Sequence, residues 1–229
     1  MNPSRPKYVR AYLALVITLG VCVLAGAGAH WRSADPERFA AYFLLACVAG
    51  ALKVRLPGMT GTYSLTFLFV LIGVVDLTFS ETVLIACFSM LVQCVWRAAI
   101  RPTPVQVIFN AASSSIAAAA AYFAGQYGGT IFPLQLLLAA PAYFAVNTML
   151  VAGILAQVEN RDFPAVWQEW FRLSLGYYLA GVVVAAVMIM SNRHFGWMFS
   201  LLALPLMYLE YLCYRVKIDG ERDSVTPSA

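Results

Sequence analysis

Residues 11–29 read AYLALVITLGVCVLAGAGA, an apolar run long enough to cross a lipid bilayer as one helix, and Arg5, Lys7 and Arg10 precede it. A helix needs about 17–25 apolar residues to span the hydrocarbon core. Basic residues before an apolar run are also typical of a signal peptide. This run is long for a signal peptide, however, and its nearest approach to a cleavage site is Ala27-Gly28-Ala29. We therefore predict an uncleaved first membrane helix.

The same composition continues along the chain, in which 62% of residues are hydrophobic and 11% are charged. This balance excludes an ordinary soluble domain. We predict an all-α fold, a polytopic membrane helical bundle of about eight transmembrane helices, although the second and third stretches are borderline in length. The eight apolar stretches are 11–29, 39–54, 63–79, 82–99, 105–126, 133–156, 173–190 and 195–213.

Basic residues mark the two sides of this bundle. Only Arg32, Arg38 and Arg193, of 15 Lys and Arg residues in all, fall at one set of loops. Short loops rich in Lys and Arg stay in the cytoplasm, so we expect a multi-pass protein of the bacterial cytoplasmic (inner) membrane with both termini cytoplasmic. Residues 1–10 and 216–229 would be short cytoplasmic segments around a membrane helical domain, 11–215. The basic residues assigned to the cytoplasmic side are Arg5, Lys7, Arg10, Lys53, Arg55, Arg97, Arg101, Arg161, Arg172, Arg215, Lys217 and Arg222.

The sequence contains no catalytic signature: HExxH, GxSxG, a P-loop and a dinucleotide-binding glycine motif are all absent. Its cysteines lack CxxC or Cys/His spacing, which indicates neither a metal site nor a disulfide framework. The net charge of +4 follows the membrane edges, where anionic lipid headgroups attract cations. We expect a non-enzymatic protein without cofactors or metals whose main partner is the lipid bilayer and which binds no nucleic acid. The cysteines are Cys22, Cys47, Cys87, Cys94 and Cys213.

Carboxylates within apolar stretches are costly to bury and are therefore candidates for function. Asp76 and Glu81 should lie at the same extracytoplasmic edge. There they attract a cation or an amine, or one of them is held protonated by burial. Alternatively, both are interfacial and solvated and cap the helix that follows Ser80, with Ser80 or Glu81 as the source of acceptors. Glu210 lies near the cytoplasmic end of the last stretch, where it either has a functional role or forms an ion pair with a nearby cation such as Arg215.

Uncharged polar residues form a second group. Asn110, with Ser113 and Ser114 one turn later, makes a polar patch that we expect to pair with Gln93 or Asn147. Such pairs act as structural hydrogen bonds between helices, or they line a pocket for a polar ligand. This alternative stays open at the level of sequence.

Small residues indicate where helices approach closely. The stretch 105–126 contains the run Ala117–Ala121, so we predict that it is central in the bundle. Gly50 and Gly176 suggest two further close crossings. Residues 163–172 follow helical spacing of Phe and Trp, which predicts an interfacial helix on the cytoplasmic leaflet or a surface helix leading into the next span.

The segment Leu56 to Thr66 concentrates helix-breaking Pro and Gly with four hydroxyls. Non-helical backbone exists at membrane depth only where protein or a wet cavity covers it. If the segment enters the bundle, it offers a small-solute site as broken helices do in transporters; if it stays at the surface, it is an ordinary turn. Its candidate ligand residues are Thr60, Thr62 and Ser64.

A family resemblance rests on four stretches of the sequence. They are Lys53-Val54-Arg55-Leu56-Pro57-Gly58-Met59-Thr60-Gly61-Thr62, residues 64–69, residues 81–96, and Arg101-Pro102-Thr103-Pro104-Val105-Gln106 through Ser113. Together they resemble the amino-terminal multi-span membrane module that precedes HD-GYP or GGDEF domains in bacterial cyclic-di-GMP signalling. The resemblance runs from about residue 10 to 215. It implies a sensor module that passes a stimulus from its last helix to a cytoplasmic enzyme, yet here the sequence stops soon after Lys217.

Two functions follow as hypotheses. The first is a non-catalytic sensor or input module that couples a membrane or extracytoplasmic stimulus to a cytoplasmic signalling enzyme, or acts as a homo-oligomer. The second is a small-solute-binding carrier subunit, similar to the substrate-capture components of energy-coupled transporters. The first is the leading hypothesis. The argument for the second is the short helices, the broken Thr-rich segment and the small-residue helices.

Overall fold

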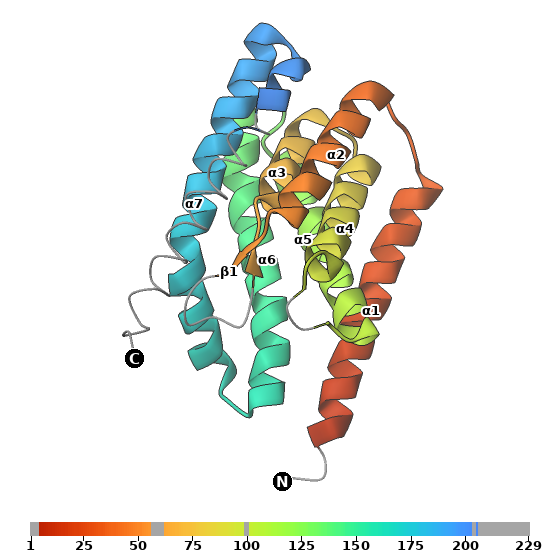
Figure 1. Ribbon diagram of the computed structural model, residues 1–229, viewed down its shortest axis with the longest axis vertical. Coiled ribbons are helices and arrows are strands. Elements are labelled where there is room, and N and C mark those ends of the chain that lie inside the picture. The colour runs from red at the N-terminus through yellow and green to blue at the C-terminus, as the bar shows by residue number, and fades with distance from the viewer. Residues whose placement is uncertain (1–4, 56–61, 99–100, 203–204, 206–229) are drawn as a thin grey trace, which may run out of the picture.

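The computed structural model describes residues 5–55, 62–98, 101–202 and 205, and these residues form a helical bundle (Figure 1). Two short strands, Val54–Arg55 and Thr62–Tyr63, pair antiparallel, with Val54 opposite Tyr63 and Arg55 opposite Thr62. The helices are α1 (Arg5–Ala29), α2 (Pro36–Ala51), α3 (Thr66–Asp76), α4 (Phe79–Val95), α5 (Pro104–Gln126), α6 (Phe132–Glu159) and α7 (Phe163–Phe195); the strands are β1 (Val54–Arg55) and β2 (Thr62–Tyr63), and a 3-10 helix, η1, covers Trp197–Leu202.

Four of the described helices contain a segment that is long and apolar enough to cross a membrane. These segments are Lys7–Ala29, Pro104–Gln126, Phe132–Glu159 and Ser174–Phe195. The predicted all-helical class is confirmed, and these helices indicate a membrane protein. By contrast, α3 has only 11 residues, which rise about 17 Å at 1.5 Å per residue, well short of a hydrocarbon core of about 30 Å. The stretch 195–213 lies largely outside the described residues, so the count of eight spans stays a prediction.

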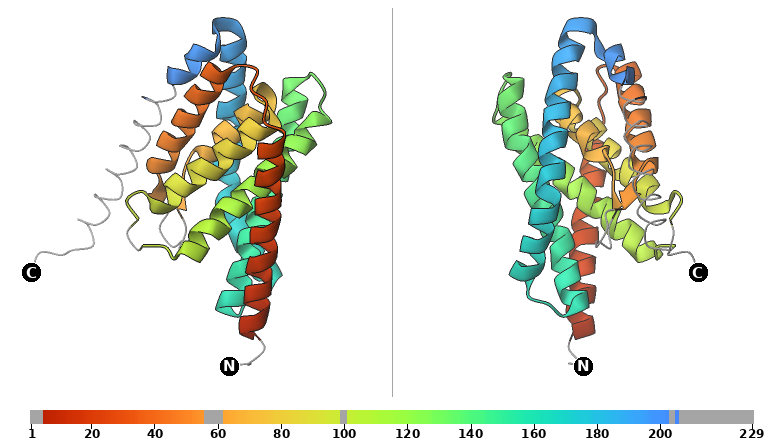
Figure 2. Two further views of the ribbon diagram at one scale, coloured as in Figure 1. Left: turned by 90° about the vertical axis from the view of Figure 1, so that its right-hand side faces the viewer. Right: turned by 60° about the vertical axis from the view of Figure 1, so that its left-hand side comes forward.

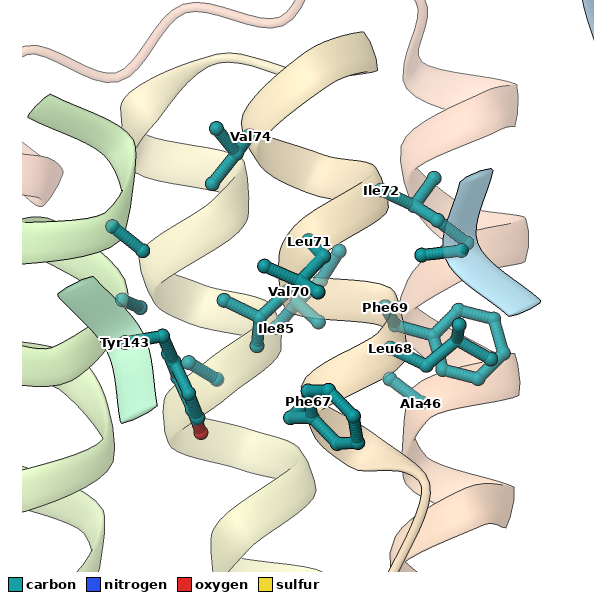
Figure 3. Packing of buried hydrophobic residues seen from close by; sticks show 14 of the residues in the cluster. Ala46, Phe67, Leu68, Phe69, Val70, Leu71, Ile72, Val74, Ile85 and Tyr143 are labelled. Carbon is teal, nitrogen blue, oxygen red and sulfur yellow. The ribbon is translucent and has the colours of Figure 1, made fainter. Parts of the chain in front are cut away.

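The short helices occupy one part of the bundle. Figure 1 shows α2, α3 and α4 grouped in its upper half, with β1 about halfway along the long axis, whereas α1, α6 and α7 extend further down. The connection between α2 and α3 therefore starts and ends at mid-height, where the long helices flank it. The main core surrounds α3, whose residues Thr66 through Val74 are all buried (Figure 3).

Helix α5 is central, as its small residues predict. It packs against α1, α3, α4 and α6. In its apolar window 56% of residues are buried, against 17%, 28% and 22% in the windows of the other three long helices. Small side chains let the neighbouring backbones approach it closely.

The two predicted glycine crossings have different outcomes. A Cβ on Gly50 would lie 2.5 Å from the carbonyl oxygen of Ser89, so the close α2–α4 crossing is confirmed. A Cβ on Gly176 would meet nothing within 4 Å, so the second prediction is wrong. Gly176 and Ala180 are exposed on α7, because the helix turns Tyr177 and Tyr178 toward the bundle instead.

Residues 163–172 do not form a separate helix, because α7 continues without a break from Phe163 to Phe195. Their apolar face packs on α6: Val166 is buried against Ala152 and Ala156. Trp167 Nε1 donates a hydrogen bond of 3.2 Å to Thr148 Oγ1. Of the two sequence interpretations, the helix leading into the next span is the one observed.

Candidate functional site

A buried polar network lies where the α2–α3 connection meets α4 and α7. Ser64 Oγ donates to Gln93 Oε1 at 2.6 Å and lies 3.0 Å from Thr66 Oγ1. All three of these side chains are less than a tenth exposed. The backbone that enters α3 therefore has its hydroxyls inside the bundle, not at a surface turn.

Two further groups complete this network. The Tyr177 hydroxyl on α7 donates to the carbonyl oxygen of Ser64, and the Lys53 ammonium at the end of α2 donates to the carbonyl oxygen of Gln93. We call Lys53, Ser64, Thr66, Gln93 and Tyr177 the polar junction. It joins α2, α3, α4 and α7 through polar groups of four different chemistries, including one cation.

Four aromatic residues, which we call the aromatic wall, border the polar junction: Phe67, Tyr143, Tyr177 and Tyr178. Phe67 packs against Tyr143, Tyr177 and Tyr178, with ring centroids 4.7–6.4 Å apart, and Figure 3 shows Phe67 and Tyr143 lying close together in the core. Asn147 Nδ2 on α6 donates to Tyr178 Oη at 3.0 Å. Asn147 is thus hydrogen-bonded to a residue of the aromatic wall, and no hydrogen bond among the described residues joins it to the polar junction itself.

The Asn110 patch pairs with α4, but with a different residue than predicted. Asn110 Nδ2 donates to Cys94 Sγ at 3.4 Å, not to Gln93 or Asn147. Neighbouring helix positions point about 100° apart, so Gln93 turns toward Ser64 and leaves Cys94 facing α5. Ser113 Oγ is buried and has no hydrogen-bond partner among the described residues, while Ser114 Oγ donates to the Ala86 carbonyl at 3.1 Å.

Asp76 belongs to a second polar group, at the other end of α3. Tyr42 on α2 and Asn192 on α7 lie near its carboxyl, and the charges of Arg38 and Arg193 act on it. Asn192 also donates to Tyr42 Oη at 2.9 Å, and Ser200 Oγ donates to Asn192 Oδ1 at 2.9 Å. We call Asp76, Tyr42, Asn192 and Ser200 the distal cluster.

Glu81 lies apart from that cluster and caps α4. Its Oε2 accepts from the Thr78 N–H at 2.9 Å and lies 2.9 Å from the Thr78 hydroxyl, while the Glu81 N–H donates to the same hydroxyl. The helix begins at Phe79 with Thr78 as its N-cap, slightly before the predicted start. The capping role of Glu81 is confirmed, but its side chain is not solvated as predicted, because Glu81 is only 1% exposed and is covered by the packing of α4.

The remaining predicted site residues add no described contact to either polar cluster. Thr60 and Glu210 lie outside the described residues, and Thr62 lies in β2. Conversely, the sequence prediction missed Lys53, Tyr42, Tyr177 and Asn192. Lys53 and Asn192 stand beside expected helix ends and were therefore assigned to loops, and a tyrosine in an apolar stretch carries no sign that its hydroxyl is used.

Loss of the cap should measurably weaken the fold. We expect Thr78→Ala to lower the free energy of unfolding by about 1 kcal/mol, the usual cost of removing an N-cap hydroxyl. The variant also loses the contact of 3.0 Å between the Thr78 hydroxyl and the Arg32 carbonyl oxygen. Thermal unfolding in detergent, followed by tryptophan fluorescence, measures this loss. The matched control is Thr130→Ala at an exposed position; equal midpoints for the two variants would refute the cap.

Loss of the Gln93 amide should have a comparable effect. Gln93→Leu removes the acceptor of the buried Ser64 hydroxyl. A buried polar group without a partner lowers the free energy of unfolding by about 1–3 kcal/mol. The loss is smaller in a bilayer, where such groups find new partners. We expect a loss of about 1 kcal/mol in the same unfolding assay. Gln126→Leu, at an exposed position, is the control and should leave the midpoint unchanged.

Comparisons with protein families, curated proteins and solved structures give no match for this chain. The fold and its polar groups define the class: a helical membrane protein in which four of the described helices are long and apolar enough to cross a membrane, with polar clusters between the helices.

Proposed function

We propose that this chain is a non-catalytic sensor or input module of a bacterial inner membrane. It couples a stimulus in the membrane or on its extracytoplasmic side to a cytoplasmic partner, either a signalling enzyme or a second copy. The observation that carries this proposal is the set of polar contacts along α7.

One continuous 33-residue helix, α7, makes polar contacts at three levels. Near its start Trp167 binds Thr148; in the middle Tyr177 and Tyr178 bind the Ser64 carbonyl oxygen and Asn147; near its end Asn192 binds Tyr42. A helix is stiff over this length. A displacement of α7 at the distal cluster therefore also displaces the start of the same helix, at Phe163. This arrangement suits transmission along α7.

Cross-linking at the start of α7 tests this function. A photoreactive phenylalanine analogue replaces Glu169, which is about half exposed, and the captured protein is identified by mass spectrometry in the native bacterium. A sensor should capture a soluble signalling enzyme or its own second copy at this position. The control places the analogue at Val183, an exposed apolar position in the middle of α7, which should capture neither. Capture of a membrane-embedded energy-coupling subunit instead would contradict the sensor proposal.

The carrier subunit is the second candidate, and the polar junction favours it. Ser64, Thr66 and Gln93 place hydroxyl and amide groups beside the Lys53 cation and the aromatic wall, groups able to hold a small polar solute at a broken helix. Native mass spectrometry of the purified protein tests this: a carrier retains one small molecule, and Gln93→Leu releases it while Gln126→Leu does not. Retention that is equal in both variants would exclude the junction as the solute site.

The proposal includes the eight-span arrangement with both termini in the cytoplasm. Reporter fusions at Gln126 and Ala229 should report outside and inside, respectively. The basic residues of the connections support this orientation. The opposite report at either position would refute it.

A further inference from the structure

The start of α4 is docked against the end of α1, on the extracytoplasmic side of the proposed arrangement. In Figure 2 (left) the connection from α1 to α2 lies at the same end of the bundle as the start of α4, and α1 and α4 contact one another. Ser80 Oγ donates to the Ala27 carbonyl oxygen at 2.7 Å, and Thr78 Oγ1 donates to the Arg32 carbonyl oxygen at 3.0 Å. Two hydroxyls at the start of α4 therefore hold the end of α1 and the connection that follows it.

Glu81 lies at this junction and is almost fully buried. It is 1% exposed, and it forms no ion pair among the described residues. Its Oε1 is buried and has no hydrogen-bond partner within the described part of the chain. An ionised carboxylate is much more costly to bury without a cation than a neutral acid, and the attraction of one helix N-terminus offsets only a small part of that cost. Burial without a cation therefore favours the protonated carboxyl.

The hydrogens available at Thr78 favour the same state. The Thr78 hydroxyl lies 2.9 Å from Glu81 Oε2 and 3.0 Å from the Arg32 carbonyl oxygen, but it has a single hydrogen to donate. If Glu81 is ionised, one of these two oxygens receives no hydrogen from the hydroxyl. If Oε2 carries a proton, Oε2 donates to Thr78 Oγ1 and Thr78 Oγ1 donates to Arg32. Both contacts are then hydrogen bonds.

The cap of α4 does not need a negative charge at Glu81. Helix α5 has the same capping box with Gln106 in the place of Glu81. Gln106 Oε1 accepts from the Thr103 N–H at 2.8 Å, and the Gln106 N–H donates to Thr103 Oγ1 at 3.4 Å. Glu and Gln both close such a box. A neutral acid at position 81 can therefore cap α4 as the neutral amide caps α5.

The helices around α4 supply no counter-ion to Glu81. Helix α4 packs against α1, α2, α3 and α5. Arg38 forms its ion pair with Asp35, and the ion pairs of the described residues include none with Glu81. The charged and titratable side chains at this end of those elements are His30 and Arg32 after α1, Asp35 before α2, Glu37, Arg38 and Tyr42 on α2, Asp76 on α3 and Tyr122 on α5.

We propose that Glu81 binds a proton from the extracytoplasmic side and that this proton ties the α1–α2 connection to α4. In the protonated form Glu81 donates to Thr78, and Thr78 donates to Arg32. When Glu81 releases its proton to solvent, the negative Oε2 takes the Thr78 hydrogen and the Arg32 carbonyl oxygen loses its donor. The connection then detaches from α4. The proton site stands without a signalling role; that acidity is the stimulus rests on the proposed function.

Infrared spectroscopy of the purified full chain in nanodiscs detects the proton directly. At about pH 7, where solvated carboxyl groups are ionised, we expect a carbonyl band of a protonated carboxylic acid that Glu81→Gln removes. Glu37→Gln, at an exposed acid in the first turn of α2, should keep the band. In Thr78→Val the band should remain and shift, because the acid loses its hydrogen-bond partner. A spectrum without an acid band that Glu81→Gln removes overturns the proposal, as does a band that Thr78→Val leaves in place.

Trp31 reports the release of the connection, because its ring packs on Phe39 with centroids 5.4 Å apart. Fluorine NMR of the chain labelled with fluorotryptophan identifies the Trp31 resonance by its loss in Trp31→Phe. All samples carry His30→Gln, which removes the titration of the neighbouring imidazole. We expect the resonance to move between about pH 6 and about pH 9, where carboxyls held neutral by burial release their protons.

Glu81→Gln should abolish this movement, and Glu37→Gln should keep it. A Trp31 resonance that moves equally in Glu81→Gln, or that does not move in the His30→Gln chain, overturns the proposal. Neither measurement uses a cytoplasmic partner. Failure of the sensor function would therefore leave both results unchanged, and failure of the proton site would leave the cross-linking result at position 169 unchanged.

Discussion

Gly20→Val is expected to lower the unfolding midpoint of this protein by several degrees and to separate α1 from α5. A Cβ on Gly20 would lie 2.4 Å from the Ala112 Cβ and 2.6 Å from the Ala112 Cα. The obstacle is a backbone atom of the central helix, so no side-chain rotation removes the clash. The two helices must move apart, which opens the cluster of Val16, Phe109 and Ala112.

The size of the effect follows from overpacking, which costs about 1–3 kcal/mol in a well-packed core. In a chain of this length each kcal/mol corresponds to a shift of about 2–4 °C. Tryptophan fluorescence during thermal unfolding in detergent measures it. Gly26→Val is the matched control, because it makes the same change in the same helix where a Cβ meets nothing within 4 Å. Similar midpoints for the two variants would contradict the close α1–α5 crossing.

Gly181→Ala is the second change with a large expected effect. The added Cβ would lie 1.9 Å from Cζ and 2.6 Å from Cε1 of Phe67. Phe67 is 3% exposed and is confined by three tyrosine rings, so its ring has no free space to turn into. We expect α7 to move away from α3, with a loss of about 1–3 kcal/mol and a weaker contact between Tyr177 and Ser64.

Two further variants make this prediction specific. Gly176→Ala, on the same helix with open space around it, should leave the unfolding midpoint unchanged. Phe67→Leu should partly rescue Gly181→Ala, because the smaller side chain withdraws the atoms that the new methyl group meets. If Gly181→Ala alone unfolds like the unmodified protein, then α3 and α7 do not pack at this point.

The sequence predicts the helices better than the contacts between them. Continuous apolar runs predicted the all-helical membrane class, and the alanines and serines of α5 predicted its central place, because both properties follow from local composition. Gln93 was recognised as a polar group at membrane depth, and Ser64 as a candidate ligand residue whose depth stayed open. Their hydrogen bond joins residues 29 positions apart, and no local pattern encodes such a pairing.

The misses have the same physical origin. Asn110 was expected to pair with Gln93 and instead reaches Cys94, a difference of one residue that depends on how α4 is rotated about its axis. For residues 163–172, the change from amphipathic to apolar composition left two interpretations open, and the interfacial one is wrong because the backbone continues as one helix through to Phe195. The continuity of α7, on which the proposed function rests, is visible only in three dimensions.

Transmission along α7 is tested most directly by disturbing one end and measuring the other. Asn192→Ala removes the hydrogen bonds that Asn192 makes to Tyr42 and to Ser200. The bond to Tyr42, which joins α7 to α2, is worth about 0.6 kcal/mol in a bilayer. This should change the yield of the cross-link from position 169 to the proposed partner about threefold. Met190→Ala, an exposed position two residues away, should leave the yield unchanged. An equal yield in both variants, at equal protein levels, would contradict the account of α7 as the transmitting helix.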